Sequence, residues 1–217
     1  KEIMRDHLKT RTPELKVRRV NDAIFADTFF SSIKSVRGFN CWNLYCYQKS
    51  GIDIPYLQAR RSQGHVTLLS CLNEHGVPNT IKTDNAPEFK SAKWNKVLNK
   101  LQIEPKFTEP HHPNQNLAER RGGIIKAWVT HILHITKAPL DYWCFCVEYV
   151  CLLRSVLAKE SLKWRTSSEL HWGHTPDISI FKYMFWQPLW YHAPTAKFLT
   201  SRMRRARFLG MAAIISD

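Results

Sequence analysis

Three acidic residues in this chain, Asp27, Asp84 and Glu119, stand where carboxylates can meet and hold metal ions. Asp27 lies inside the apolar run 23–30, Asp84 ends the run 80–84, and Glu119 opens a long helical pattern. Carboxylates from two neighbouring strands and a covering helix can converge on one point, where their like charges repel strongly. Divalent cations offset such repulsion, and hard oxygen ligands suit Mg²⁺ or Mn²⁺. The three residues therefore predict a metal-dependent catalytic site.

Each carboxylate taken alone also has an ordinary structural explanation. Asp27 can cap a turn, Asp84 can belong to a turn after a strand, and Glu119 can favour the positive end of a helix dipole. Glu88 is a rival carboxylate close to Asp84. The dense apolar flank of Asp27 argues against the ordinary explanation there, because a buried Asp needs compensation. Taken together, the three residues form an ordered set: Asp84 follows Asp27 by 57 positions, and Glu119 follows Asp84 by 35.

The chain is strongly basic, with 32 Lys and Arg against 18 Asp and Glu, a formal charge of +14 and a pI near 9.7. This excess favours nucleic acid as partner, with a merely solvated basic surface as the alternative. No apolar stretch approaches the roughly 18 residues that a membrane span needs, so we expect no membrane partner. A length of 217 residues, 44% of them hydrophobic, is enough for one domain with a real core.

The cysteines predict a reducing environment. None of the six pairs as C-x-x-C, and they lie among aromatic and aliphatic residues, as buried free thiols do. We therefore expect an intracellular chain, located in the nucleus if its source is a eukaryote. A zinc site formed by cysteines with His131 or His134 is the weaker alternative.

The hydrophobic pattern predicts an alternation of strands and helices. The predicted strands are 23–30, 41–47, 51–57, 80–84 and 103–108, and the predicted helices are 63–75, 90–101, 116–134 and 139–158. Runs of strands followed by alternation indicate a mixed sheet with helices on its faces. Pro55 places the third strand at an edge, because proline cannot donate to a ladder.

Three helices show predicted core stripes. The stripes comprise Val66, Leu69 and Leu72, with His65 and Leu68 beside them, in the first helix; Trp94, Val97, Leu98 and Leu101 in the second; and Ile124, Ile125, Trp128, Ile132 and Ile135 in the third. We expect three parts along the chain: a basic lead-in segment over 1–20, a core domain over 21–158, and a C-terminal extension over 159–217 that is basic at its end.

The chain resembles the catalytic core of a retroelement integrase. Thr83-Asp84-Asn85-Ala86-Pro87-Glu88-Phe89 is similar to the family pattern T-D-N-G-x-E-F, and Asn116-Leu117-Ala118-Glu119-Arg120 is similar to N-G-x-A/S-E-R. The spacing of 35 matches the D,D-35-E signature within one residue, and Ala26-Asp27-Thr28 matches its first Asp. The resemblance covers roughly 18–135. More weakly, 175–177 and 207–210 resemble the segments that follow the core in copia-type polyproteins.

This resemblance implies an α/β, RNase H-like fold with a five-stranded mixed sheet flanked by helices. It implies DNA 3′-end processing and strand transfer as the activity, with Asp27, Asp84 and Glu119 as catalytic residues. The same residues would hold two Mg²⁺ or Mn²⁺ ions about 4 Å apart, which would activate water or a 3′-hydroxyl and stabilise the leaving oxygen. The implied partners are element-end DNA, a target duplex and further copies of the chain.

The basic residues near these motifs are the predicted DNA contacts. Lys126 follows Glu119 by seven residues on one helix face, and the C-terminal run has no acid among its bases. The full predicted set is Asn85, Arg120, Arg121, Lys126, Arg202, Arg204, Arg205 and Arg207. For the helix residues, a solvated surface is the alternative.

Two departures from the family pattern leave a second hypothesis open. Ala86 and Leu117 stand where the family has glycine, a residue that often serves a positive φ or a close approach. A catalytically disabled, integrase-derived DNA-binding domain is therefore the alternative to an active enzyme. An RNase H-like nuclease outside the integrases is less favoured, because its third carboxylate is not expected in an A-E-R context.

Overall fold

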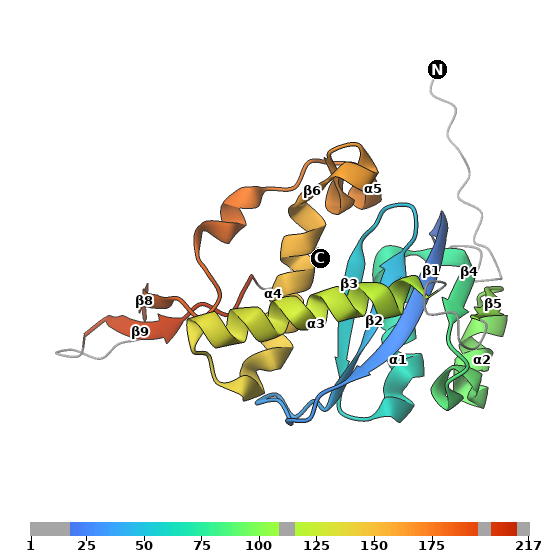
Figure 1. Ribbon diagram of the computed structural model, residues 1–217, viewed down its shortest axis with the longest axis horizontal. Coiled ribbons are helices and arrows are strands. Elements are labelled where there is room, and N and C mark those ends of the chain that lie inside the picture. Colours follow the sequence, from blue (N-terminus) through green and yellow to red (C-terminus); the bar gives the residue numbers. More distant parts are fainter. Residues whose placement is uncertain (1–17, 109–115, 195–200, 212–217) are drawn as a thin grey trace, which may run out of the picture.

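The computed structural model describes residues 18–108, 116–194 and 201–211, and a five-stranded mixed sheet forms its centre (Figure 1). The strand order is β3-β2-β1-β4-β5. The strands are β1 (Arg19–Phe30), β2 (Cys41–Tyr47), β3 (Asp53–Gln58), β4 (Val77–Thr83) and β5 (Glu104–Phe107). The first three strands pair antiparallel, whereas β4 pairs parallel with β1 and with β5. The predicted mixed sheet and the edge position of β3 are thus confirmed.

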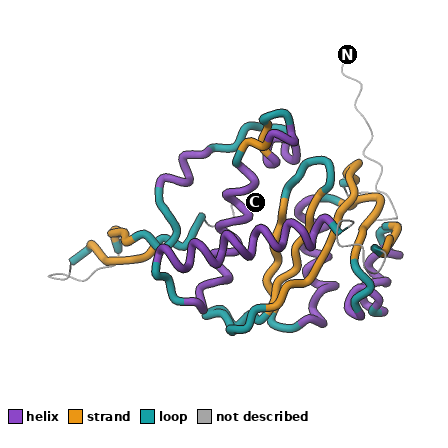
Figure 2. Tube along the Cα trace, in the orientation of Figure 1, coloured by secondary structure: helices purple, strands orange, loops and turns teal. Residues whose placement is uncertain are grey.

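Four helices flank this sheet (Figure 2). They are α1 (Gly64–His75), α2 (Ala92–Lys100), α3 (Leu117–Thr136) and α4 (Trp143–Val156). Side-chain caps fix two of the starts: Ser91 Oγ accepts from Trp94 N at 3.3 Å, and Asn116 Oδ1 accepts from Ala118 N at 3.1 Å. The predicted order of elements is confirmed, and predicted ends differ by a few residues.

The sheet separates two hydrophobic clusters, because alternate strand residues face opposite sides. On β1, Ile24 and Ala26 belong to the cluster with α1 and α2. Phe25 and Phe29 belong to the cluster with α3 and α4. Asp27 lies between Phe25 and Phe29 in this alternation, and thus on the α3 side of the sheet.

The predicted core stripes were partly wrong. The stripe Trp94, Val97, Leu98 and Leu101 is buried as predicted. On α1, Leu68 and Leu72 are buried as predicted, but Val66 and Leu69 are 51% and 39% exposed. On α3, Ile124, Trp128 and Ile135 are exposed, and the buried side chains are Ala118, Ile125, Val129 and Leu133. Both helices are rotated by about one position from the predicted face, because apolar residues on both sides of each stripe leave the periodicity ambiguous.

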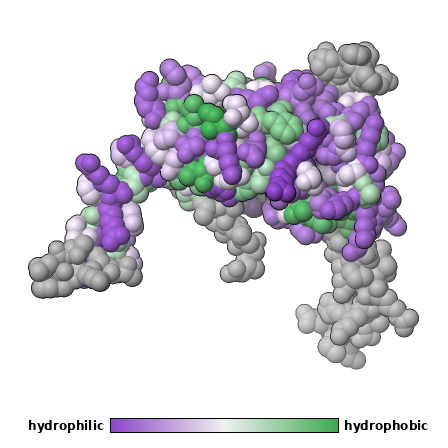
Figure 3. All heavy atoms as spheres, turned by 90° about the horizontal axis from the view of Figure 1, so that it is seen from below, coloured by the Kyte–Doolittle hydropathy of each residue, from purple (hydrophilic) through white to green (hydrophobic). Residues whose placement is uncertain are grey.

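The segment after α4 packs partly on the core and partly away from it. It contains the short pair β6 (Ala158–Lys159) and β7 (Arg165–Thr166), α5 (Ser167–Trp172), and the hairpin of β8 (Pro188–His192) and β9 (Met203–Arg207). Phe185 is 2% exposed and joins the α3–α4 cluster. The β8–β9 hairpin projects from the body, with hydrophilic side chains over much of it (Figure 3).

Six cysteines are free and buried, as predicted. No helix in the described ranges is long and apolar enough to span a membrane. The predicted boundaries at 20 and 158 stay predictions, and most of the lead-in segment lies outside the described residues.

Candidate active site

Asp27 and Asp84 lie side by side where the parallel pairing of β1 with β4 ends. The parallel ladder of β1 and β4 ends at the pair Ala26↔Thr83, so Asp27 and Asp84 are each the next residue. Lys82, two residues before Asp84, lies with its Nζ 4.9 Å from the centre of the Phe25 ring, on the α3 side of the sheet. Asp84 directly follows β4, whereas Asp27 lies within β1, which continues to Phe30 in its antiparallel pairing with β2. Both aspartates therefore lie where the parallel pairing of β1 with β4 ends.

Glu119 reaches this edge from α3. It lies in the first turn of the helix, where Asn116 Oδ1 accepts its backbone N–H at 3.3 Å. One turn further, α3 touches β1 so closely that a Cβ on Gly122 would overlap Cζ of Phe29. Since Phe29 is two residues from Asp27, this contact sets the distance between the start of α3, which carries Glu119, and the part of β1 that carries Asp27.

The pKa of Asp27 reports burial and nearby negative charge. Burial, together with the smaller effects of the charges of Asp84, Glu119 and Glu88, raises this pKa to about 7. The Thr28 backbone N–H, which donates to Oδ1 at 2.7 Å, opposes the rise. The three predicted carboxylates therefore share one electrostatic neighbourhood, which Glu88 joins as a fourth.

The donor chemistry of this neighbourhood fits a divalent cation, although its side chains do not yet surround one. None of Asp27, Asp84 and Glu119 makes an ion pair with another described residue. Asp84 Oδ1 instead accepts the Ala86 N–H at 3.1 Å. Within the described ranges, no three His, Cys, Asp or Glu side chains are arranged to hold a metal. Carboxylate rotations would be needed to complete a site for Mg²⁺ or Mn²⁺.

Arg61 also lies near these carboxylates, and sequence reasoning missed it. Its Nη2 lies 2.5 Å from Oε2 of Glu88, while its guanidinium lies 5.6 Å from the Phe30 ring centre. Hydrogen bonding to Glu88 raises the pKa of Arg61, against the opposing effect of burial, and the charges of Glu88 and Asp84 raise it as well. Nothing in the local pattern distinguishes Arg61 from Arg60, because the partner that selects it lies 27 residues away.

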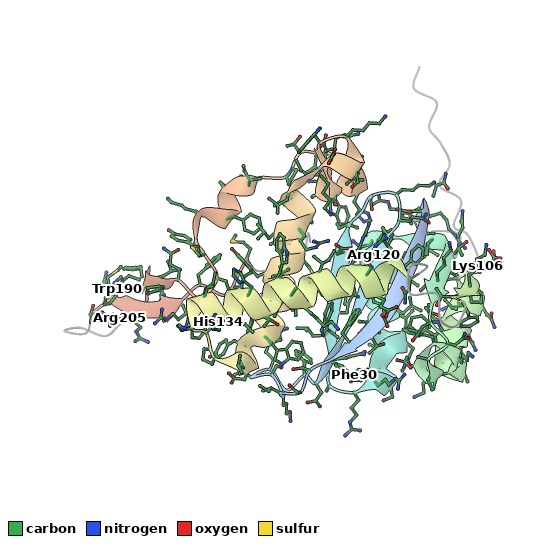
Figure 4. All side chains as sticks on the ribbon, viewed as in Figure 1. Phe30, Lys106, Arg120, His134, Trp190 and Arg205 are labelled. Atoms are coloured by element: carbon green, nitrogen blue, oxygen red, sulfur yellow. The ribbon has the colours of Figure 1, made fainter. Side chains whose placement is uncertain are left out.

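Three of the predicted DNA contacts lie close to the carboxylates. Arg120 is exposed at the start of α3 (Figure 4). Lys126 is exposed, and its Nζ lies 5.0 Å from the ring centre of Phe29. Asn85 is exposed and donates to the Thr108 carbonyl at 3.4 Å.

Arg121 lies apart from these three, and its role as a DNA contact stays a prediction. Its side chain is 16% exposed, and Nη1 lies 2.9 Å from Oδ1 of Asp53, which also pairs with Arg154 at 3.1 Å. Nη1 donates to the Tyr47 carbonyl as well, at 3.3 Å. Arg121 thus ties α3 to β3 and α4, since the helical turn that exposes Arg120 directs the next residue inward.

The C-terminal arginines lie at the opposite end of α3. In Figure 4, Arg120 marks the end of α3 close to the carboxylates and His134 marks the other end. Arg205 and Trp190 lie beyond His134, on the hairpin. Arg202, Arg204, Arg205 and Arg207 are all exposed. Arg205 lies 5.2 Å from the centre of the Trp190 ring. The predicted DNA contacts therefore form two separate groups.

Neither family departure strains the backbone. Ala86 has φ −64° and ψ 147°, an extended conformation that any residue adopts. Leu117 is the first residue of α3 and packs against the α3–α4 cluster, and neither residue has a positive φ. Glycine is therefore not required for backbone conformation at either position.

Solved structures supply the likeness that sequence comparison does not, since no protein-family model and no curated protein matches the chain. The HTLV-2 integrase catalytic core domain in complex with magnesium, in a trimeric form, has a TM-score of 0.56 at 18% identity and covers 70% of this chain and 96% of its own. The dimeric form of the same domain has a TM-score of 0.54 at 20% identity, and the match covers 70% of this chain and 95% of that one. A chain of the simian T-cell lymphotropic virus intasome in complex with PP2A regulatory subunit B56 gamma has a TM-score of 0.60 at 21% identity. This match covers 88% of this chain and 71% of that one.

These likenesses establish the fold class. The chain has the RNase H-like fold of retroviral integrase catalytic cores, with a five-stranded mixed sheet flanked by helices.

Proposed function

We propose that this chain is the integrase catalytic core of a copia-type retrotransposon polyprotein, catalysing metal-dependent 3′-end processing and strand transfer of DNA. The observation that supports this most directly is the shared electrostatic neighbourhood of Asp27, Asp84 and Glu119, where the parallel pairing of β1 with β4 ends. The D,D-35-E spacing and the integrase-like fold point the same way.

In this proposal, Asp27, Asp84 and Glu119 hold two Mg²⁺ or Mn²⁺ ions. When bound, the ions would supply Lewis-acid chemistry: they would make the attacking oxygen more nucleophilic and offset the negative charge on the leaving oxygen. The aspartates are well suited to this role, because the ladder of β1 and β4 fixes the backbone beside them. Burial and the neighbouring carboxylates already disfavour the charged form of Asp27. Arg120 and Lys126 on α3 would bind phosphates of the reacting DNA.

The remaining basic residues would lengthen the DNA path. Asn85 lies beside Asp84, and the hairpin bearing Arg202, Arg204, Arg205 and Arg207 lies beyond the far end of α3. An excess of +14 is suited to a long contact with a polyanion. We propose element ends and a target duplex as the DNA partners, a homo-oligomer as the working form, and a nuclear location in a eukaryotic host. The dimeric and trimeric forms of the HTLV-2 domain support the oligomer.

A catalytically disabled DNA-binding domain is the second candidate, and the substitutions at Ala86 and Leu117 are what favour it. Their unstrained backbones remove one reason for inactivity.

Strand transfer separates these two candidates. The assay uses Mg²⁺ or Mn²⁺, a duplex with a recessed 3′ end, and the chain restored to its flanking domains. We expect Asp27→Asn, Asp84→Asn and Glu119→Gln to abolish transfer with fold and DNA affinity nearly intact, because each keeps size and shape but loses a charged ligand. Glu88→Gln changes the rival carboxylate and should keep measurable activity. An inactive unmutated protein would favour the disabled domain, and full activity of Glu119→Gln would remove Glu119 from the site.

A further inference from the structure

Two short helical turns from distant parts of the chain meet beside the carboxylates. Arg61 begins the turn Arg61–Gln63 ahead of α1, and Glu88 lies in the turn Pro87–Lys90 that follows Asp84. Both turns are anchored. Gln63 Oε1 accepts the backbone N–H groups of Ala59 and Arg60 at 3.0 Å each, and the neighbour of Glu88, Phe89, is 1% exposed. The Arg61–Glu88 pair is therefore built on fixed backbone.

The two partners of this pair differ sharply in burial. The Glu88 side chain is 5% exposed, whereas the Arg61 side chain is 45% exposed. Glu88 holds one edge of the guanidinium and the Phe30 ring lies near it. Apart from Glu88, the guanidinium has no hydrogen-bond or ion-pair partner in the described ranges. Most of its five donors thus remain open to solvent at the edge of the acidic site.

We propose that Arg61 binds a DNA phosphate at the entrance to the carboxylate site, and that Glu88 is the positioning residue that aims it. This inference rests on the proposed function, since it takes DNA as the ligand. A planar guanidinium is pre-organised for phosphate, and a buried carboxylate behind it reduces the rotamer freedom that binding must remove. Glu88 serves poorly as a metal ligand, because its departure would leave Arg61 without its partner.

Binding in metal-free buffer tests the role of Arg61 without any turnover. Anisotropy of a labelled duplex, followed over a salt series in EDTA, compares Arg61→Gln with Arg60→Gln, a neighbour that undergoes the same change of charge. We expect Arg61→Gln to weaken binding about fivefold at 0.1 M salt and to lower the salt slope by about 1. Arg60→Gln should stay within about twofold of the unmutated chain. Equal losses of DNA affinity in both variants would show that Arg61 contributes only its positive charge, as Arg60 does, and would overturn the assignment.

Glu88→Gln gives a test in which two explanations have opposite signs. Removing a negative charge near DNA tightens binding if charge alone matters, whereas loss of positioning weakens it. We expect weaker binding, by about two- to threefold, and no further loss when Glu88→Gln is added to Arg61→Gln. Tighter binding by Glu88→Gln, at unchanged thermal stability, would end the positioning role.

The strand-transfer readout keeps this inference distinct from the proposed function. For Glu88→Gln we expect a raised KM for DNA with kcat retained. Loss of kcat comparable to that of Asp27→Asn would instead make Glu88 a metal ligand and sink the inference. If the unmutated protein transfers no strands, the proposed function fails, while the binding series still decides whether Arg61 contacts DNA.

Discussion

Gly122 on α3 lies against the ring of Phe29 on β1, at a distance that leaves no room for a side chain. Phe29 shares the α3 side of the sheet with Asp27, and Gly122 lies three residues after Glu119. This single contact therefore couples the spacing of helix and sheet to the spacing of the carboxylates.

Replacing Gly122 with Ala should displace α3 from β1. We expect a loss of about 1–3 kcal/mol in unfolding free energy, the range typical of overpacking, and a larger relative loss of strand transfer. Gly123→Ala is the matched control, since a Cβ there meets nothing within 4 Å. It should stabilise the chain by up to about 1 kcal/mol through helix propensity. Urea unfolding measures both, and equal effects of the two variants would contradict the close-approach argument.

The Asp53 ion cluster should contribute far more to stability than a surface pair. Asp53 is 1% exposed at its side chain and faces both Arg121 and Arg154, so Asp53→Asn leaves two poorly solvated cations without their anion. We expect a loss of roughly 3–5 kcal/mol in unfolding free energy. Glu148→Gln breaks the half-exposed pair with Arg37 and should cost less than about 1 kcal/mol. A similar, small effect of both substitutions would show that the Asp53 cluster is not a structural centre.

The hairpin arginines should affect affinity but not chemistry. Converting Arg202, Arg204, Arg205 and Arg207 to Gln should weaken binding to duplexes of any sequence alike, because phosphate contacts carry no sequence information. If about six phosphates are neutralised by the whole chain, log K against log[salt] should slope near −5, and the variant should be less steep. Strand transfer at saturating DNA should be retained, since the hairpin lies beyond the far end of α3 from Arg120. A salt response unchanged by the four substitutions would remove the hairpin from the DNA path.

The order of strands and helices could be predicted from sequence because local signals marked it. Gly76 ends α1 and Pro78 lies at the start of β4, and the period of two in β1 fixes which side Asp27 faces. The placement of Asp27 and Asp84 together follows from parallel pairing of their strands, which the family resemblance supplied and composition did not.

Arg61 and Arg121 show what could not be predicted. Both are arginines beside an arginine, and each is selected by one distant carboxylate, Glu88 in one case and Asp53 in the other. Such pairs are decided by tertiary packing, to which a local pattern is blind. Gly122 was missed for the same reason. A side chain is excluded at this position only because Phe29 of β1 packs directly against it.

The pKa of Asp27 should make stability depend on pH in metal-free buffer. The folded value is about 7 against an ordinary 3.8, so between these limits only the unfolded chain gives up the proton. Unfolding then releases a proton, and the stability of the folded chain falls as pH rises from about 4 to 7. His75 and His171 act oppositely, since burial lowers their pKa values to about 3 and about 4. Their contribution is lost as pH falls from about 6.5 to 4, and it partly masks that of Asp27.

Asp27→Asn should separate the two contributions. In EDTA, we expect its melting temperature to exceed that of the unmutated chain by a margin that grows from pH 4 to 7 and then stays level, because the variant retains only the histidine effect. Adding Mg²⁺ should shrink the margin by stabilising the unmutated chain, whose carboxylate the ion would compensate. Glu160→Gln, which changes an exposed carboxylate, serves as the control and should parallel the unmutated chain at every pH. A margin for Asp27→Asn that is constant from pH 4 to 8 would show that Asp27 is ionised throughout, and that the neighbouring carboxylates place no strain on it.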